Sequence, residues 1–264
     1  MKTINPSELS PMQVQMILQT AVAPRPIALA STIDKNGNVN LSPFSFFNLF
    51  SSNPPILIFS PARRVRDNST KDTLHNVLEV PEVVIGNVNF DMVQQVSLSS
   101  TEYETGVDEF IKSGLTKKPA ELVKPPLIAE SPVNFECKVI EVKPLGNEGG
   151  AGNLVICEVL KIHIREEFLN EEGNLDQKKL DLVSRLGGNW YGRTTAETLF
   201  EVPKPLVTKG IGFDQLPSEI KNSKIFTGND LGMLANVEQL PEGNFSADEN
   251  LHLEAQKLLL EGKI

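Results

Sequence analysis

"PRPIALASTIDKNGNVNLSPFSFFNLFSSNPPILIFS", residues 24–60, carries the signals that decide the fold of this chain. The apolar segments IALASTID and VNLS flank KNGN, and the Asn36-Gly37 pair is typical of a tight hairpin turn. The continuous apolar run ILIFS at 56–60 has the length of a buried strand. Residues 43–55 follow neither a strand nor a helix period, so we expect an apolar loop there. The stretch predicts antiparallel strands joined by local turns.

Outward from this stretch, short helices and strands alternate irregularly. Helical spacing covers SPMQVQMILQTAV, residues 10–22, with Pro11 as a plausible first-turn residue, and the helix ends before Pro24. A second apolar strand covers 82–88. Residues 90–100 have the pattern of a helix, and residues 101–131 predict a lid or a connecting loop. Two longer strands cover 133–143 and 153–165, and the glycines of LGNEGGAGN between them suit a flexible hairpin connection. Residues 176–193 predict a helix or a short strand that ends at Gly187-Gly188.

Five or more short strands with helices inserted between them favour a mainly β fold, a closed antiparallel barrel with helical decoration. The strands do not alternate regularly with helices, which argues against a doubly wound parallel sheet. From residue 202 the chain is rich in Pro and Gly, with a predicted helix over 247–262. We therefore expect a domain over 1–200 and a C-terminal extension over 201–264. Because its apolar elements are short, we expect the extension to lack its own core and to pack on the barrel or on a partner subunit.

Composition excludes several classes of protein. The chain has 264 residues and a net charge of −9, and surfaces that bind nucleic acid are usually basic. Cys137 and Cys157 lie in apolar runs, so we expect two buried free thiols and a reducing compartment. The three histidines are His75, His163 and His252, too few for a convincing metal site. The N-terminus lacks an apolar signal core and no stretch is long enough for a bilayer, so we expect a cytoplasmic protein without membrane contact.

The octapeptide STKDTLHN, residues 69–76, has two interpretations. In the structural one, Ser69 caps a helix and Asp72 lies three residues later, a variant of the capping box. In the functional one, Lys71 and Thr73 in the first turn hold a phosphate, because helix N-termini favour anions. Arg63, Arg64 and Arg66 lie just upstream. Asp72 fits the cap and opposes the phosphate. With the aromatic, hydroxyl-bearing SPFSFFN upstream, the layout suits a flavin mononucleotide (FMN) site.

Residues 24–60, followed by KDTLHN and VVIGNV, resemble the flavin reductase-like family of FMN-binding split-barrel proteins, which includes flavoredoxin-type proteins. The resemblance covers about 23–88 and resumes weakly at VLKIHIREEFL and RLGGNWYGR. It implies a six-stranded antiparallel Greek-key split barrel that forms a homodimer, with FMN near the dimer interface. It says little about the chain after residue 202.

The resemblance also implies the cofactor-binding residues. A flavin's pyrimidine edge needs several hydrogen-bond partners, and the loop after the first hairpin would supply them, largely through its backbone. That loop consists of Ser42, Pro43, Phe44, Ser45, Phe46, Phe47 and Asn48. Ser31, Thr32 and Ser60 would flank the ribityl chain or the phosphate. The phosphate would be held by Lys71, Asp72 and Thr73, with Arg25 and one of Arg63 or Arg64 adding charge.

Four further residues allow a structural and a functional interpretation. Trp190, Tyr191 and Arg193 follow a predicted stop at two glycines, so they are either packed aromatics or part of a substrate pocket. In the second case, an aromatic would face the flavin and Arg193 would face an anionic group. His163 is either a half-exposed strand residue or a pocket residue near flavin or nicotinamide.

The function implied is that of an FMN-dependent oxidoreductase, similar to NAD(P)H:flavin reductases. Reduced nicotinamide would reduce the flavin, which would pass electrons to a small-molecule acceptor. The cofactor does the chemistry, so no catalytic side chain is assigned. One alternative is a flavoredoxin-type electron carrier without its own NAD(P)H site. Another is a non-catalytic FMN-binding protein whose C-terminal extension contacts a partner.

Overall fold

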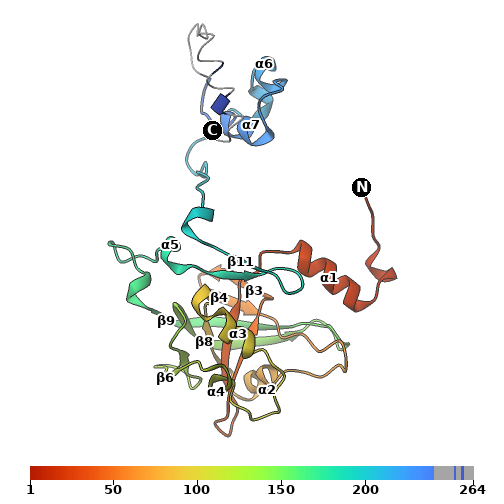
Figure 1. Ribbon diagram of the computed structural model, residues 1–264, viewed down its shortest axis with the longest axis vertical. Coiled ribbons are helices and arrows are strands. Elements are labelled where there is room, and N and C mark those ends of the chain that lie inside the picture. Colours follow the sequence, from red (N-terminus) through yellow and green to blue (C-terminus); the bar gives the residue numbers. More distant parts are fainter. Residues whose placement is uncertain (241–252, 254–256, 259–264) are drawn as a thin grey trace. The chain divides into compact units, whose positions relative to one another are not determined.

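The chain forms two compact units, Met1–Leu199 and Phe200–Ile264. The computed structural model describes residues 1–240 together with 253, 257 and 258, and each unit is described by itself. A large β-sheet dominates the first unit (Figure 1). Among the described helices, none is both long enough and apolar enough to cross a membrane.

Within the described residues the main sheet has seven strands in the order β2-β1-β5-β8-β9-β4-β3, and all neighbouring pairs are antiparallel. This confirms the predicted mainly β, split-barrel class, with one strand more than the six expected. The bounds are β1 (Ala28–Ile33), β2 (Val39–Phe44), β3 (Phe47–Ser52), β4 (Pro55–Phe59), β5 (Glu82–Gly86), β8 (Val133–Pro144) and β9 (Asn153–Ile164).

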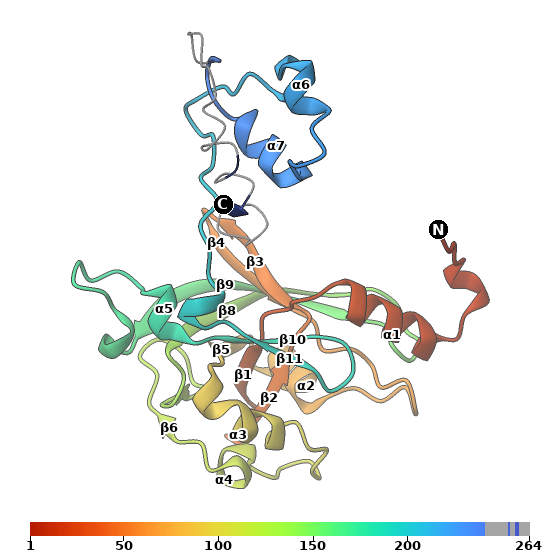
Figure 2. The same cartoon turned by 45° about the horizontal axis from the view of Figure 1, so that its top comes forward.

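The additional strand is β3, and the prediction of a loop over 43–55 is wrong. This segment contains the end of β2, a two-residue turn, and β3, which pairs with β4. A register shift between Leu49 and Ser51 interrupts the pairing. Such a bulge breaks the two-residue alternation by which strands are recognised. The β3–β4 hairpin extends beyond the other strands of the sheet (Figure 2), and Leu49 and Phe50 are exposed on it.

The turn between β1 and β2 confirms the prediction from KNGN. Asp34 Oδ1 accepts hydrogen bonds from the N–H groups of Asn36 and Asn38, both at 2.8 Å. Gly37 has φ +91°, a conformation that costs a glycine little. The local turn sets the register in which Ala28 lies opposite Phe44.

The sheet is buried on both faces near β1, because two separate cores meet there. Ala28 and Ala30 belong to the first core, which also contains Phe59 and Val155. Leu29 belongs to the second core, between the sheet and the helices. This explains why IALAS is apolar throughout instead of alternating.

Cys137 and Cys157 are free and buried in the first core, as the sequence predicts. Burial raises the pKa of Cys137 to about 12 and also raises the pKa of Cys157. Both thiols are therefore neutral core residues at physiological pH.

Four helices of the first unit cover the sheet or border it: α1 (Pro11–Ala21), α2 (Asp72–Glu79), α3 (Val93–Leu98) and α4 (Glu109–Ser113). The 3-10 turns η1 (Pro6–Glu8) and η2 (Phe90–Met92) precede α1 and α3. The α3 and α4 helices lie side by side (Figure 2) and contribute Val96 and Phe110 to the second core. The helices predicted within 10–22 and 90–100 are thereby confirmed.

Residues 101–131 form a packed connection rather than a lid. They contain α4 and the short strands β6 (Lys117–Lys118) and β7 (Leu127–Ile128), and Ile128 is buried in the second core. The Glu136 carboxylate accepts hydrogen bonds from the N–H groups of Glu121, Leu122 and Val123. These contacts hold the connection against β8.

Residues 166–199 contain both a helix and strands, where the sequence left the choice open. They form η3 (Glu166–Phe168), α5 (Gln177–Leu180), β10 (Val183–Arg185), β11 (Tyr191–Arg193) and η4 (Ala196–Thr198). The β10–β11 turn contains Gly187 and Gly188, and Gly188 has φ +58°. The two glycines therefore turn the chain, as expected, but they do not end the structure.

The second unit contains η5 (Phe213–Gln215), α6 (Ser218–Lys221) and α7 (Gly228–Leu234). Leu216, Leu231 and Ala235 are buried together, with partly buried Ile211 and Phe226 against them. The prediction that this segment lacks a core of its own is therefore wrong, because its short elements bury their apolar faces on one another. The helix predicted over 247–262, with His252, lies outside the described residues apart from Leu253, Lys257 and Leu258.

Candidate functional site

A cavity of about 910 Å³ opens in the first unit between α1, the turn after β2 and the segment that follows β4. Its volume is in the range of cavities that bind cofactors. Sequence-predicted residues that line it are Arg25, Pro43, Phe44, Ser45, Phe46, Ser60, Arg63, Arg64 and Lys71. The structure thus brings the β2 turn, the arginines and Lys71 of the octapeptide to one place.

One wall of the cavity is the apolar side of α1, with Val14, Leu18 and Val22. A capping box between Ser10 and Gln13 begins this helix. None of its residues is fully buried, so contacts at its C-terminal end hold it in position. There a Cβ added to Gly187 would lie only 2.2 Å from Thr20 Oγ1, so glycine permits the close approach of α1 to the β10–β11 turn.

Arg25 makes the second contact that holds α1. Its guanidinium donates to the carbonyl oxygens of Gln19, Val22 and Leu186, and its Nε lies 3.4 Å from Ser45 Oγ. Burial, followed by the charge of Arg185, lowers the pKa of Arg25. The sequence predicts that Arg25 adds charge for a phosphate, whereas the structure uses its donors to join the end of α1 to the turn after β10.

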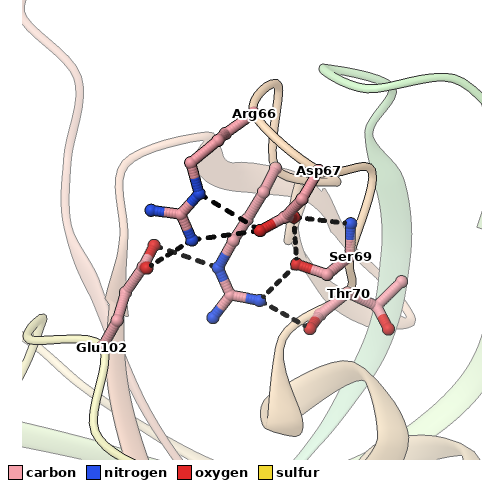
Figure 3. A network of polar contacts seen from close by, with 6 residues as sticks. Arg66, Asp67, Ser69, Thr70 and Glu102 are labelled. Atoms are coloured by element: carbon pink, nitrogen blue, oxygen red, sulfur yellow. Dashed lines mark hydrogen bonds and ion pairs between the residues drawn. The ribbon is translucent and has the colours of Figure 1, made fainter.

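The basic segment, residues 61–70, forms the opposite wall and carries three arginines. Arg63 donates from Nε to Asn68 Oδ1 at 2.7 Å. Arg64 donates from Nη1 to Ser69 Oγ and to the Thr70 carbonyl, both at 2.9 Å. Figure 3 shows this network from close by. These contacts within the segment fold it back on itself. Arg63, Arg64 and Arg66 of this segment line the cavity.

The glycine-rich hairpin loop between β8 and β9 supports the basic segment. The Arg63 N–H donates to the Ala151 carbonyl at 2.8 Å, and the Gly150 N–H donates to the Arg63 carbonyl at 3.0 Å. A Cβ on Gly149 would lie 3.0 Å from the Arg64 carbonyl oxygen. The glycines here permit a close backbone approach, beyond the flexible connection that the sequence predicts.

Lys71 lies at the inner end of the basic segment, immediately before α2. Its Nζ lies 5.7 Å from the centroid of the Phe44 ring. No carboxylate in the described part of the chain forms an ion pair with it. Burial, with Arg64 as the next cause, lowers the pKa of Lys71. A half-buried cation without a counter-ion is a favourable place for a bound anion.

The N-terminus of α2 lacks the predicted cap, so the capping box from Ser69 to Asp72 is wrong. The helix begins at Asp72, its N-cap residue is Lys71, and no side chain caps it. Ser69 Oγ instead donates to Asp67 Oδ1 and accepts from Arg64. Among the described groups, none accepts from the N–H of Asp72 or Thr73. These donors and the helix dipole add to the attraction of Lys71 for an anion.

Asp72 and Thr73 do not line the cavity. Thr105 Oγ1 donates to Asp72 Oδ1 at 3.3 Å. Asp72 and Thr105 line a separate cavity of about 390 Å³, and Thr73 does not line it. The Asp72 carboxylate thus lies outside the candidate cavity, although its charge still acts on Lys71. Thr73 is buried, and its hydroxyl donates to Asn40 Oδ1 at 2.7 Å. The predicted phosphate contact of its side chain is replaced by this internal one.

Five other predicted cofactor residues lie next to the cavity without lining it: Ser31, Thr32, Ser42, Phe47 and Asn48. Ser31 and Thr32 are fully buried in β1, and Thr32 Oγ1 accepts from Asn76 Nδ2 at 3.1 Å. Ser42 is buried within β2, whereas Pro43 and Phe44 at the end of this strand line the cavity. The predicted loop is a strand and a turn, so only part of it reaches the cavity.

Trp190, Tyr191 and Arg193 lie outside this cavity as well. Arg193 forms a two-point ion pair with Asp181, with Nε at 2.8 Å and Nη2 at 2.7 Å, and lies 3.6 Å from the centroid of Phe90. Tyr191 and Arg193 line a small separate cavity of about 200 Å³. Trp190 is largely exposed. The exposure of Trp190 does not fit the packed aromatics of the structural interpretation, and the assignment of these three residues to a substrate pocket stays a prediction.

His163 is also separate from the cavity. Its Nε2 lies 2.6 Å from Oε1 of the fully buried Glu136. Burial alone would raise the pKa of Glu136, but the three N–H donors of residues 121–123 and His163 lower it. His163 therefore stabilises a buried carboxylate, which is a structural role.

The sequence analysis missed the cavity residues that come from distant segments. These are Pro6, Leu9, Pro11, Gln15, Gln19, Ala62, Val65, Glu102, Gly149 and Gly150, in addition to the apolar side of α1. Arg66 was noted beside the octapeptide but was not assigned to the site. For α1, the helical spacing of its apolar residues, next to the prolines that end the helix, was a signal that could have indicated an apolar wall. Nothing in the local pattern around Glu102 indicates a site.

Comparison with known proteins agrees with this architecture. Residues 21–181 match the flavin reductase like domain, and the chain belongs to this family. Protein BH2278 of Halalkalibacterium halodurans is 38% identical over 208 residues, which covers 78% of this chain and 98% of that protein. A protein of Aquifex aeolicus is 36% identical over 181 residues, covering 69% and 90%.

Several solved structures share the fold. Nitrilotriacetate monooxygenase component B from Bacillus cereus superposes with a TM-score of 0.71 at 27% identity, covering 76% of this chain and 98% of that one. The 2-nitrobenzoate 2-nitroreductase NbaA of Pseudomonas fluorescens gives 0.68 at 27% identity, covering 79% and 100%. Flavoredoxin of Desulfovibrio vulgaris gives 0.58 at 21% identity, which shows the fold alone.

Proposed function

We propose that the cavity binds FMN and that the protein is an NAD(P)H-dependent, flavin reductase-like oxidoreductase. The observation that carries this proposal is Lys71, which has no ion pair with any residue that the structure describes. It lies at the uncapped start of α2, beside Phe44 and in a cavity of cofactor size. An FMN-type ligand has a flat apolar ring system at one end and a phosphate at the other. The cavity has apolar walls and a cationic inner end, so it matches both.

The groups of this chain would divide the binding between them. Lys71 and the free N–H groups of α2 would hold the phosphate, as helix N-termini commonly do. The turn residues Pro43 to Phe46 and the apolar side of α1 would enclose the ring and exclude water from it. Bound flavin would supply the redox chemistry, accepting electrons from a nicotinamide and passing them to a small-molecule acceptor.

A titration of the purified protein with FMN and with riboflavin tests the binding proposal. Riboflavin carries the same ring system without the phosphate, so the ratio of the two affinities measures the contribution of the cationic end. We expect FMN to bind at micromolar concentration or below, and at least tenfold more tightly than riboflavin. Absence of FMN binding at micromolar concentration would contradict the proposal.

The enzyme and the electron carrier differ in their use of nicotinamide. Steady-state oxidation of NADH and of NADPH, with FMN or FAD added as acceptor, separates them. Turnover with either nucleotide supports the reductase. FMN binding without turnover would favour the alternative, a flavoredoxin-type carrier without its own NAD(P)H site, or a non-catalytic FMN-binding protein.

The proposal includes a homodimer. Exposed apolar side chains support it, since Leu49 and Phe50 stand out on the β3–β4 hairpin and Leu160 and Ile162 on β9. Apolar side chains gathered on a surface commonly mark a protein–protein interface. Sedimentation velocity of the native protein and of a Phe50→Asp variant tests this. We expect a dimer that the substitution weakens, and a monomeric native protein would refute it.

A further inference from the structure

The carboxylate of Glu102 faces two arginines of the basic segment, and all three residues line the cavity. Oε1 of Glu102 accepts from Arg64 Nε at 3.0 Å, and Oε2 accepts from Arg66 Nη2 at 3.2 Å. Figure 3 shows that Glu102 comes from a different segment of the chain and reaches across to both guanidinium groups. Arg66 also pairs with Asp67 at 3.0 Å.

The three side chains of this cluster differ in how exposed they are. The exposed fraction is 25% for the Arg64 side chain, 48% for Glu102 and 73% for Arg66. Lys71, at the inner end, has no ion pair among the described residues, as shown above. The cavity therefore has two cationic places. The inner one, at Lys71, forms no direct ion pair with a described residue and feels Glu102, Asp72 and Glu109 only from a distance. The outer one, at Arg64 and Arg66, is directly paired with Glu102 and Asp67.

We propose that Glu102 makes the cavity selective for flavins that end in a single phosphate group, because it occupies the arginine pair that a second phosphate would need. This inference rests on the proposed function and adds a specificity-determining residue to it. FMN ends at its one phosphate, which the inner place accepts. FAD continues through a second phosphate into an adenosine.

Two effects would act against the second phosphate. Its negative charge would come next to the Glu102 carboxylate, and like charges brought together reduce affinity. Paired arginines are favourable phosphate partners. The second phosphate could reach Arg64 and Arg66 only by displacing the Glu102 carboxylate, which both arginines already bind. The hydrogen bonds from Arg64 and Arg66 lower the pKa of Glu102, so the carboxylate is charged at neutral pH.

The test measures dissociation constants of riboflavin, FMN and FAD for the native protein and for Glu102→Gln. Glutamine keeps the size of the side chain and removes its charge. We expect the affinity for FAD to rise about five- to tenfold relative to FMN, and the affinity for riboflavin to stay unchanged. Binding is measured directly, by calorimetry or by flavin fluorescence, so no catalytic turnover is required.

Glu104→Gln is the matched control. Glu104 is an exposed carboxylate two residues further along the same loop and forms no ion pair with a described residue. The control removes the same charge from the same loop, so it should leave the FAD-to-FMN ratio unchanged. An equal shift in both variants would mean that net charge, rather than the position of Glu102, determines the ratio, and would overturn the proposal.

A double variant sharpens the test. If the gain in FAD affinity depends on a freed guanidinium, adding Arg66→Gln to Glu102→Gln should remove most of it. An unchanged FAD-to-FMN ratio in Glu102→Gln, with FMN still bound by the native protein, refutes the role of Glu102 and leaves the proposed function in place. A native protein that binds no flavin refutes both. The circular dichroism spectrum of each variant establishes that it is folded.

Discussion

Glu136 and Lys71 are two charged side chains withdrawn from solvent, and the protein treats them in opposite ways. The Glu136 carboxylate is fully buried and accepts hydrogen bonds from three backbone N–H groups, with His163 against it. Lys71 is half-buried, and no described carboxylate pairs with it. A buried charge whose partners are all internal stabilises the fold, whereas a charge without an internal partner is available to a ligand. The difference separates the structural site from the candidate binding site.

The largest expected effect comes from Glu136→Gln. The amide cannot serve three N–H donors as a carboxylate does, and it leaves His163 without its partner. We expect the free energy of unfolding of the first unit to fall by about 2–4 kcal/mol, measured by urea unfolding. FMN affinity of the folded variant should change little. Glu121→Gln is the control, because Glu121 is an exposed partner of Lys161 and should cost about 1 kcal/mol or less. An equal loss in both variants would contradict the structural role of Glu136.

The same carboxylate predicts a pH dependence. Its pKa is lower in the folded protein than in the unfolded chain, so it contributes stability that is present above the unfolded pKa. That contribution is lost as the pH falls from about 4.5 through the folded pKa. Unfolding free energies measured across this range should decline less steeply in Glu136→Gln than in the native protein. Parallel curves would show that Glu136 has no lowered pKa.

Lys71→Met should have the opposite profile to Glu136→Gln. We expect FMN affinity to fall about 10- to 100-fold, because a charge-assisted contact of about 1.5–3 kcal/mol is lost. Stability should stay the same or rise, since the variant removes an unpaired, half-buried charge. Riboflavin affinity should not change. Lys112→Met is the matched control, because Lys112 also lies over an aromatic ring, that of Tyr103 at 5.5 Å, but outside the cavity. A large loss of stability in Lys71→Met would remove the distinction from Glu136.

The smallest expected effect tests the support of the basic segment. In Gly149→Ala the new Cβ would lie 3.0 Å from the Arg64 carbonyl oxygen, so the segment must shift by a few tenths of an ångström. We expect FMN to bind about threefold more weakly, with little change in stability. Gly146→Ala in the same loop, where the nearest atom is Ala151 Cβ at 3.3 Å, should have no effect on FMN affinity. Equal affinities in the two variants would show that the hairpin loop does not position the arginines.

Local signals predicted much of the fold. The hairpin at residues 34–38 depends on Asp34 and Gly37, which act within five residues, so the sequence pattern was sufficient. The β3 strand was missed because its bulge removes the alternation on which strand prediction relies. The predicted helix began at about Thr70 with Ser69 as its cap, whereas α2 begins at Asp72. The Ser69 hydroxyl does not cap the helix, because it is engaged by Asp67 and by Arg64.

The sequence predicted several of the residues that form the candidate site, but it predicted only part of their arrangement in space. Lys71, Phe44 and the arginines meet in one cavity, as the order of their motifs along the chain suggested. Thr73 and Asp72 were assigned to the phosphate from their spacing, but the fold turns both toward other partners. The apolar wall at α1 depends on the contact of Arg25 with the Leu186 carbonyl, 161 residues away, which no local pattern encodes.

The sequence by itself determined six of the seven strands of the main sheet, the first hairpin, the buried cysteines and the presence of cations beside an aromatic turn, because each depends on neighbouring residues or on a short period. Tertiary structure alone decided which cation remains without a partner. Glu102 reaches Arg64 from 38 residues away and pairs with it, while Lys71, seven residues further along, forms no ion pair within the described part of the chain. A charged side chain is available to a ligand only where no other side chain of the protein pairs with it. Partners that are distant in sequence are brought together only by tertiary packing.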